Sequence, residues 1–308
     1  MGRSMNQGVW GSWEWNEKHF PADKLDTSGD TWGIRWRGME KLRHHSYLDM
    51  IDVALHRSRP VAILDIGCAL CDFTNKVWNL NRHNEISGMD ISPQAVAWTT
   101  AKFPAFNIKL AAIPEIPFER EFDVIFCLEV LCYLDRTGRH KTVEEIYRRL
   151  APDGVVMFSG VLDGGVQHHT EQEAYELFAE GFDIQNVSYN YWSSYRRLIE
   201  HPLDACLETL DSMIRITTMP GDEFAAWKSS GRGRIARCLA QAFRLVAGVS
   251  VRAMQALRQF VKLLIAWQLP AKISQQISSS SRGRKNADEI LLLAIKKPAS
   301  HRTGRGLD

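Results

Sequence analysis

The sequence lacks several features that would place it in a specialised class of protein. Its 308 residues include six cysteines, too few for a disulfide scaffold, so reduced thiols are expected. No second Cys-x-x-Cys or His pair joins Cys68 and Cys71 as a zinc ligand set, and we expect no metal. No uninterrupted apolar run reaches about 18 residues, so no membrane-spanning helix is expected. The composition, 45% hydrophobic and 24% charged, is ordinary for a folded protein.

Acidic residues are missing from one long segment. Residues 224–287 contain no Asp or Glu but hold twelve Lys or Arg. Removing these twelve from the total of 38 leaves 26 basic residues against 36 acidic ones in the rest of the chain. The net charge of +2 therefore combines an acidic body with a strongly basic segment. So small a net charge argues against a general nucleic-acid coat.

The first residues are polar and lack the apolar core of a signal peptide. Asn6 stands where an N-myristoylation motif has Ser or Thr. We therefore expect a cytoplasmic protein, peripheral on the inner face of a membrane if the basic segment binds lipid.

Short apolar runs alternate with helical patterns from residue 60 onward. Such alternation is typical of a parallel α/β sheet with helices on both faces. We predict a doubly wound, Rossmann-like, mostly parallel sheet with a large helical insert before its last strand. The expected strands are 61–66, 86–90, 107–111, 122–127, 155–161, 182–191 and 289–296. The expected helices are 40–56, a stretch ending near 80, one opening at Ser92-Pro93, 141–150 and 171–180.

Ligands of such sheets bind where the strands end. A dinucleotide site after the first strand would want glycines at 67, 69 and 72, but the chain has Gly67, Ala69 and Asp72. Asp72 would repel a pyrophosphate, so a nicotinamide cofactor is disfavoured. Asp90 ends the second strand, where an acid can accept hydrogen bonds from two ribose hydroxyls. The alternative for Asp90 is a helix N-cap or a surface acid.

Five motifs in order carry a family resemblance. They are Leu64-Asp65-Ile66-Gly67-Cys68-Ala69, Gly88-Met89-Asp90-Ile91-Ser92, Ile116-Pro117-Phe118, Phe122 to Leu131 (FDVIFCLEVL) and Leu150-Ala151-Pro152-Asp153-Gly154-Val155. Over about residues 60–165 the sequence resembles the class I S-adenosylmethionine-dependent methyltransferases. Within that superfamily it is most similar to the nodulation-protein-S-like group, whose first motif tolerates Ala at the second glycine position.

The resemblance implies S-adenosylmethionine as cofactor and assigns roles to the turn after the first strand. Asp65 would orient this turn and help to hold the methionine ammonium group. Gly67, Cys68 and Ala69 would let the backbone approach the cofactor. Cys71 stands where the family commonly has Gly, which puts cofactor affinity in question.

The resemblance also assigns roles at the later strand ends. Asp90 would bind the ribose hydroxyls, and Ile91 would pack on the adenine. Ala112-Ile113 stand where the family often has an acid facing the adenine amino group, so contact there would fall to the backbone. Leu128-Glu129 would border the methionine moiety and the acceptor.

Methyl transfer is an in-line displacement in which the protein aligns the acceptor and can remove a proton. Glu129 and Tyr133 follow the fourth strand, and His168 and His169 follow the fifth, so these four are the candidate catalytic residues. The two histidines could instead be a solvated pair before the N-cap Thr170. Glu129 could instead be a structural carboxylate or one that only contacts the cofactor.

The chain divides by composition into four segments. Residues 1–58 form an N-terminal lid and lead-in helix, in which Trp32, Arg35 and Trp36 either close over the site or simply pack on the core. Residues 59–195 and 286–298 form the methyltransferase core. Residues 196–285 form a basic amphipathic helical insert, and residues 299–308 form a polar tail.

Within the insert, residues 232–268 carry a basic stripe at helical spacing and an opposite apolar face that ends in Trp267. The pattern predicts one helix, or two broken near Gly248. Such a helix suits an anionic membrane surface, or it packs on the acidic body or on a second subunit in a homodimer. Nucleic acid is disfavoured because the apolar residues are aliphatic at helical spacing. Residues 278–284 are expected to be a flexible linker.

Together these features predict an S-adenosylmethionine-dependent methyltransferase (EC 2.1.1.-) that N- or O-methylates a small-molecule, saccharide or lipid-linked acceptor. Two alternatives remain open. One is a non-catalytic cofactor-binding scaffold that recruits a partner at a membrane, and the other is an RNA methyltransferase.

Overall fold

The computed structural model describes residues 35–55, 59–162, 168–190, 192–220, 223, 251–282 and 287–298. Trp32, the first half of the predicted amphipathic helix and the polar tail lie outside these residues. The described chain divides into two compact units. The sheet unit contains residue 35, residues 42–190 and those from 279 on, and the helical unit contains 36–41 and 192–278. The segment bounds predicted from composition stay predictions.

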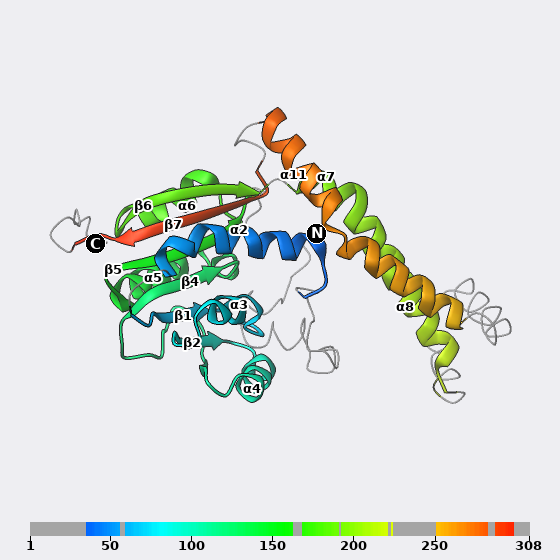
Figure 1. Ribbon diagram of the computed structural model, residues 1–308, viewed down its shortest axis with the longest axis horizontal. Coiled ribbons are helices and arrows are strands. Elements are labelled where there is room, and N and C mark those ends of the chain that lie inside the picture. The colour runs from blue at the N-terminus through cyan, green and yellow to red at the C-terminus, as the bar shows by residue number, and fades with distance from the viewer. Residues whose placement is uncertain are drawn as a thin grey trace, which may run out of the picture. The chain divides into compact units, whose positions relative to one another are not determined.

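The sheet unit is built on seven strands in the order β3-β2-β1-β4-β5-β7-β6 (Figure 1). Strands β1 to β5 pair in parallel, whereas β7 runs antiparallel to both β5 and β6. The mostly parallel, doubly wound sheet is therefore as predicted. The strands are β1 Ala62–Ile66, β2 Glu85–Asp90, β3 Asn107–Leu110, β4 Phe122–Leu128, β5 Leu150–Val161, β6 Phe182–Asn190 and β7 Glu289–Lys296.

Helices cover both faces of this sheet because its strands are apolar on both sides. Alternate residues of β1 show this, since Leu64 packs with α5 (Arg136–Arg149) and α6 (Glu171–Ala179), whereas Ile63 packs with α2 (Gly38–Leu55) and α3 (Asp72–Leu80). Helix α4 (Pro93–Lys102) begins as predicted, with Ser92 as N-cap and Pro93 in its first turn.

Two elements begin five residues earlier than the sequence predicted. Helix α5 begins at Arg136 and not near 141, because the Asp135 side chain caps it by accepting the Gly138 N–H at 2.7 Å. Strand β5 begins at Leu150 and not at 155, and its first residues are irregular, with Asp153 left-handed at φ 59°.

The helical unit holds the continuous run of α7 (Ser193–Tyr195), a π-helical turn (Arg196–Glu200) and α8 (His201–Thr218), followed by helical residues 251–266 and α11 (Gln268–Arg282). Leu207 and Leu210 of α8 pack against Val261 and Ile265. The linker predicted at 278–284 is wrong over 278–282, where α11 continues because the amphipathic turns before it override the weak helix propensity of serine. Among the described residues no helix is long and apolar enough to cross a membrane.

Candidate functional site

The turn between β1 and α3 is held in a left-handed backbone that only glycine fits at its first position. Gly67 has φ 69°, and a Cβ there would lie 2.5 Å from Cγ2 of Val130, just after β4. The N–H groups of Gly67 and Cys68 both donate to the Met89 carbonyl, at 2.8 and 3.0 Å. Ala69 and Cys71 are also left-handed, at φ 44° and 53°. Ala69 and Cys71 therefore adopt backbone conformations that favour glycine, and the turn is strained at both positions.

Asp65 lies beneath this turn, buried among apolar residues. The Thr74 hydroxyl donates to its carboxylate. Burial raises the Asp65 pKa to about 7, and the charge of Asp90 adds to the rise against the lowering effect of Thr74. A nearby cation would stabilise the ionised form of this carboxyl, which fits the predicted contact of Asp65 with an ammonium group.

Asp90 is fixed at the end of β2 by two backbone groups. Its Oδ2 accepts the Ala69 N–H and its Oδ1 accepts the Ser92 N–H, both at 2.8 Å. Ser92, not Asp90, caps α4, which removes the N-cap alternative. Burial raises the Asp90 pKa, and the backbone donors offset part of that rise. Each oxygen keeps lone-pair capacity, so this carboxylate can still accept two hydroxyl groups and fits a ribose diol.

The other residues predicted to bind cofactor lie around Asp90 and β4. Ile91 follows Asp90 directly and is half-buried. The Ala111 N–H donates to the Asp90 carbonyl at 3.1 Å, which brings the Ala112-Ile113 segment beside it. Ala112 is exposed and Ile113 half-buried. These side chains and the turn therefore gather where strand order reverses between β1 and β4, the place where such sheets bind ligands.

Of the three residues proposed as a lid, the two that the structure describes lie in different units. Arg35 pairs with Asp72 at the start of α3 (Nε–Oδ1 2.7 Å) and stacks over the Trp98 ring at 4.7 Å. Trp36 packs with the apolar core of the helical unit. Arg35 thus reaches the helix that follows the glycine turn, whereas Trp36 fits the alternative of simple packing.

Glu129 lies one residue beyond β4, half-buried and left-handed at φ 57°. Its N–H donates to the Ser159 carbonyl at 3.2 Å, and its Oε1 lies at hydrogen-bond distance from the Ser159 hydroxyl oxygen, 3.0 Å away. Burial raises the Glu129 pKa to about 8, with Glu289 as the next contributor. Leu128, the last residue of β4, is half-buried beside it. A strained backbone and a carboxyl that is neutral at pH 7 mark this position as a functional candidate.

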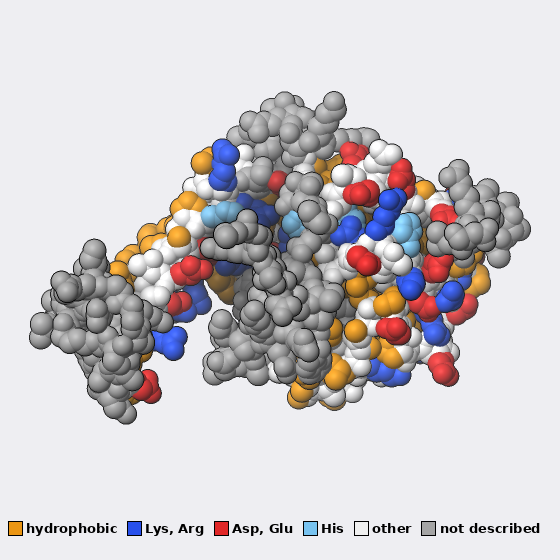
Figure 2. Space-filling view, turned by 180° about the vertical axis from the view of Figure 1, so that it is seen from behind, with side chains coloured by type: hydrophobic (Ala, Val, Ile, Leu, Met, Phe, Trp, Pro, Cys, Tyr) orange, Lys and Arg blue, Asp and Glu red, His pale blue; other side chains and the backbone are white. Residues whose placement is uncertain are grey.

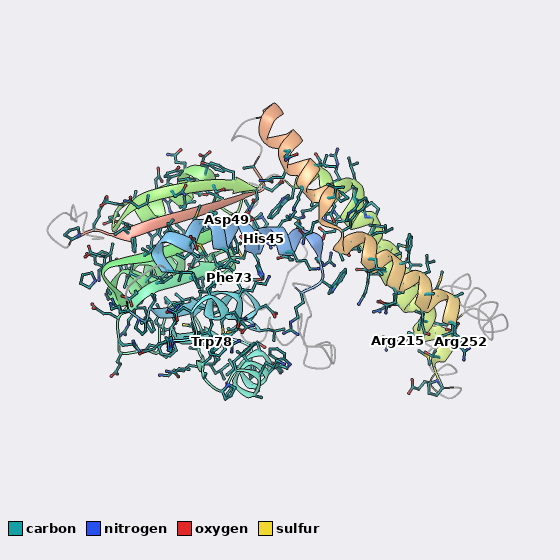
Figure 3. The ribbon with its side chains drawn as sticks, in the orientation of Figure 1. His45, Asp49, Phe73, Trp78, Arg215 and Arg252 are labelled. Carbon is teal, nitrogen blue, oxygen red and sulfur yellow. The ribbon has the colours of Figure 1, made fainter. Side chains whose placement is uncertain are left out.

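Sequence reasoning missed the partners of Glu129. Glu289, the first residue of β7, accepts from the Tyr47 hydroxyl at 2.6 Å, from Asn190 Nδ2 at 2.8 Å and from Arg43 Nε at 3.4 Å. Tyr47 points from α2 onto the ring of Phe73, 5.4 Å between centroids, and Figure 3 labels Phe73 below α2. The available signal in the sequence was Glu289 itself, the acid that begins the apolar run EILLLAIK. Its partners Asn190 and Tyr47 lie 99 and 242 positions away, so local pattern could not reveal them.

Three predicted catalytic side chains lie less favourably. Tyr133 is in the 3-10 turn after β4 (Leu131–Tyr133), where burial raises its pKa, so it serves as a proton donor more readily than as a base. His169 is 1% exposed, packs edge-on against Phe158, and burial lowers its pKa to about 4. Such burial weighs against His169 as a base at neutral pH. His168 is half-buried. Thr170 caps α6, as expected in the alternative interpretation of the two histidines.

A separate hollow of about 380 Å³ lies at the far ends of α3 and α4. Because those helices run back from the carboxyl ends of the strands, this hollow lies near the amino ends, away from Asp90 and Glu129. Its lining residues are Asn75, Trp78, Asn79, Arg82, Lys102, Phe103, Pro104 and Ala105.

Comparison with known proteins agrees with this geometry. Residues 64–156 match the family model of a methyltransferase domain. The malonyl-(acyl-carrier protein) O-methyltransferase of Bacillus cereus is 21% identical over 155 residues, which are 50% of this chain and 55% of that protein. The chain therefore spans about half the length of the curated relative that it matches.

Solved structures share the fold at low identity. Coclaurine N-methyltransferase bound to N-methylheliamine and S-adenosylhomocysteine is 14% identical, with 82% of this chain and 72% of that chain covered and a TM-score of 0.50. The N-methyltransferase NodS from Bradyrhizobium japonicum WM9, in complex with S-adenosyl-L-homocysteine, is 20% identical, with 59% and 90% covered and a TM-score of 0.48.

Seven strands in this order, with a glycine turn after the first and an acid after the second, define a Rossmann-like nucleotide-binding domain. Within this fold, residues 64–156 match the model of a methyltransferase domain, in agreement with the resemblance found in the sequence. The predicted fold is confirmed, and the family match supports the predicted methyltransferase superfamily. The roles of individual residues stay predictions.

Proposed function

We propose that this protein transfers a methyl group from S-adenosylmethionine to the nitrogen or oxygen of a small-molecule, saccharide or lipid-linked acceptor. S-adenosylmethionine supplies an electrophilic sulfonium methyl group. Asp90 would hold the ribose, Asp65 the ammonium group and the turn at Gly67 the backbone contacts. The observation that carries the proposal is the Asp90 carboxylate, fixed by two backbone N–H groups with acceptor capacity to spare.

Calorimetric binding of S-adenosylhomocysteine tests this proposal. Asp90→Asn removes the charge and one acceptor, and hydrogen bonds to a charged group are worth about 1.5–3 kcal/mol, so we expect affinity to fall roughly 10- to 100-fold. Glu85→Gln is the matched control, because Glu85 lies at the opposite end of the same strand, where its exposed side chain pairs with Arg120. Absence of binding to the wild type at millimolar ligand would overturn the proposal.

We also propose that the helical unit docks on an anionic membrane surface. Large exposed apolar side chains recur every three or four residues from 257 to 267, and two more follow in α11, while orange side chains gather along this unit in Figure 2. They are Leu257, Phe260, Leu263, Trp267, Leu269 and Ile273. We call them the apolar stripe. An exposed stripe in a segment without any acid from 224 to 287 suits a surface that is both apolar and negatively charged.

Two bases of this segment are engaged within the unit. Arg258 pairs with Asp211 of α8, and the Lys262 ammonium lies 5.1 Å from the Trp36 ring centroid. Arg252 is exposed, and Figure 3 labels it beside Arg215 at one end of the helical pair. Among the described residues 251–273, the six exposed side chains of the apolar stripe outnumber the two exposed bases, Arg252 and Lys272, which favours lipid over RNA as the partner of this face.

Co-sedimentation with vesicles of phosphatidylcholine and phosphatidylglycerol tests the membrane proposal. Replacing Phe260 and Leu263 by Gln should lower the bound fraction several-fold, because each exposed side chain would otherwise enter the acyl boundary. Leu198→Gln is the matched control, since Leu198 and Leu263 are 67% and 68% exposed. Binding to RNA with equal affinity, or a stable dimer that buries the stripe, would overturn it.

A further inference from the structure

The four side chains Tyr47, Ser159, Glu129 and Glu289 form a hydrogen-bonded chain at the carboxyl edge of the sheet, here called the proton circuit. Its three oxygen–oxygen contacts are Glu289 to Tyr47 at 2.6 Å, Tyr47 to Ser159 at 2.8 Å and Ser159 to Glu129 at 3.0 Å. Each contact needs one proton, but the two hydroxyl groups supply only two. The third proton must therefore belong to a carboxyl group, so the pair Glu129–Glu289 holds one proton.

The groups that face this pair favour the same protonation state. Arg43 of α2 is the nearby cation, and it balances the single negative charge that remains. The other titratable neighbours of Glu129 are Tyr47, Cys127, Cys132 and Tyr133, and burial raises the pKa of each, so all four are neutral at pH 7. Burial and Glu289 together raise the pKa of Glu129 to about 8.

The proton circuit is partly exposed at Glu129 and buried at its other members. Tyr47, Ser159 and Glu289 are all 2% exposed or less, whereas Glu129 is half-buried. Val130, the next residue after Glu129, lies directly against the glycine turn at Gly67. A ligand held at that turn would therefore meet the circuit at Glu129 and could not touch its other members.

We propose that Glu129 accepts the proton released by the methyl acceptor and that Glu289, Tyr47 and Ser159 are positioning residues that keep it able to do so. This inference rests on the proposed function. The acceptor's lone pair forms the new bond to the methyl carbon while the carbon–sulfur bond breaks and sulfur keeps its electron pair. The acceptor's N–H or O–H proton goes to Glu129 as the proton of Glu129 shifts along the circuit toward Glu289. After product release the extra proton leaves to solvent through Glu129.

Sinefungin tests this assignment because it carries an ammonium group where S-adenosylmethionine carries its methylsulfonium. Calorimetry in buffers of different ionisation enthalpy counts the protons released on binding. At pH 7 we expect sinefungin to release about one proton more than S-adenosylhomocysteine does, since a cation facing the pair expels its shared proton. Asp65 responds equally to both ligands, because both carry the same amino-acid group, so the difference isolates the circuit.

Two isosteric variants and one control complete the experiment. Glu129→Gln and Glu289→Gln keep hydrogen-bonding atoms in place, and each should abolish the extra proton release. Asp49→Asn should leave the extra proton release unchanged, because Asp49 is an exposed residue of α2, labelled in Figure 3. Infrared difference spectra between the ligand-free wild type and each Gln variant should show that either variant loses a protonated carboxyl band at pH 7, while the band of Asp65 is common to all three proteins and cancels.

The outcomes separate the two proposals. If S-adenosylhomocysteine does not bind, the proposed function fails and this inference fails with it. If it binds and both ligands release the same number of protons, only the inference is overturned. A protonated carboxyl band at pH 7 that is the same in the wild type and in both Gln variants also overturns it, whatever the ligands do.

Discussion

The sheet unit and the helical unit bury their side chains to very different degrees. In the sheet unit Ile63, Ile125 and Phe126 are fully buried, and the helices on both faces exclude water from the strands. In the helical unit one small core around Leu210 and Ile265 holds α8 against residues 251–266, and a row of large apolar side chains stays in water on the outside.

The difference indicates what each unit is built for. A sheet packed on both faces can hold buried polar groups such as Asp65 and Glu289 in fixed positions, because their partners cannot move away. A pair of helices with a thin core cannot position chemistry so well, but it can present an apolar surface. The difference therefore supports our proposals that catalysis takes place in the sheet unit and that the helical unit docks on a surface.

The largest expected effect comes from removing a buried ring of the sheet. Phe126→Ala in β4 should lower the free energy of unfolding by about 3–5 kcal/mol, because it leaves a cavity between α3 and the strands. Phe260→Ala in the helical unit should change it by less than about 0.5 kcal/mol, because Phe260 is 56% exposed. Urea unfolding followed by circular dichroism measures both, and similar losses would erase the distinction between the units.

An ion cluster should matter most where the apolar core is thin. Arg37 bonds Glu200 at 3.0 Å and Asp204 at 2.8 and 2.9 Å, where the π-helical turn meets α8. Arg37→Leu should cost about 2 kcal/mol, since it leaves the buried Glu200 carboxylate without its cation while water still screens Asp204.

Hydrogen exchange locates that loss. Amides of α8 and of residues 251–266 should exchange faster in Arg37→Leu, while β1 and β4 keep their protection. Arg215→Leu, at an exposed position of α8, should leave exchange unchanged. Equal acceleration in the sheet would mean that the units do not open independently.

The sequence predicted the first of these units far better than the second. Runs such as AILDI and FDVIFCL are apolar on both faces, so their strands follow from local pattern, whereas the order in which the strands pair does not. The cluster at Glu129 could not be foreseen, because Tyr47 and Glu289 are brought to it only by tertiary packing. Nor could an apolar face show which residues pack on α8, as Ile265 does, and which stay exposed, as Leu263 does.

The pH dependence of stability should also separate the units. Glu129 binds its proton more tightly in the folded protein, because its pKa rises from 4.5 to about 8. Its stabilising contribution is therefore full below pH 4.5 and is lost as the pH rises through 8. Glu129→Gln should remove about 1–2 kcal/mol of the decline in unfolding free energy between pH 5 and 9. The exposed control Asp49→Asn should keep that decline.

A helix cap in the sheet unit should give a smaller loss. The Thr170 hydroxyl accepts the Glu173 N–H at 3.1 Å, and Glu173 Oε2 accepts the Thr170 N–H at 2.8 Å, so the start of α6 is capped in both directions. Thr170→Ala should cost about 1 kcal/mol in urea unfolding, whereas Thr170→Ser should cost much less. A loss of 3 kcal/mol or more would mean that α6 itself positions the catalytic edge.

The smallest expected effect comes from replacing the left-handed Cys71. Two contributions to the unfolding free energy oppose each other at this position of the sheet unit. Cys71→Gly relieves the strain of φ 53°, a gain of about 1 kcal/mol, but removes a thiol that is 1% exposed, a loss of similar size. We expect the unfolding free energy to change by less than about 1 kcal/mol. Affinity for S-adenosylhomocysteine should change less than about threefold, because the turn is already held by the Cys71 N–H bond to the Cys68 carbonyl at 2.7 Å. A tenfold gain in affinity would instead mean that packing of the sheet unit strains the turn at the expense of cofactor binding.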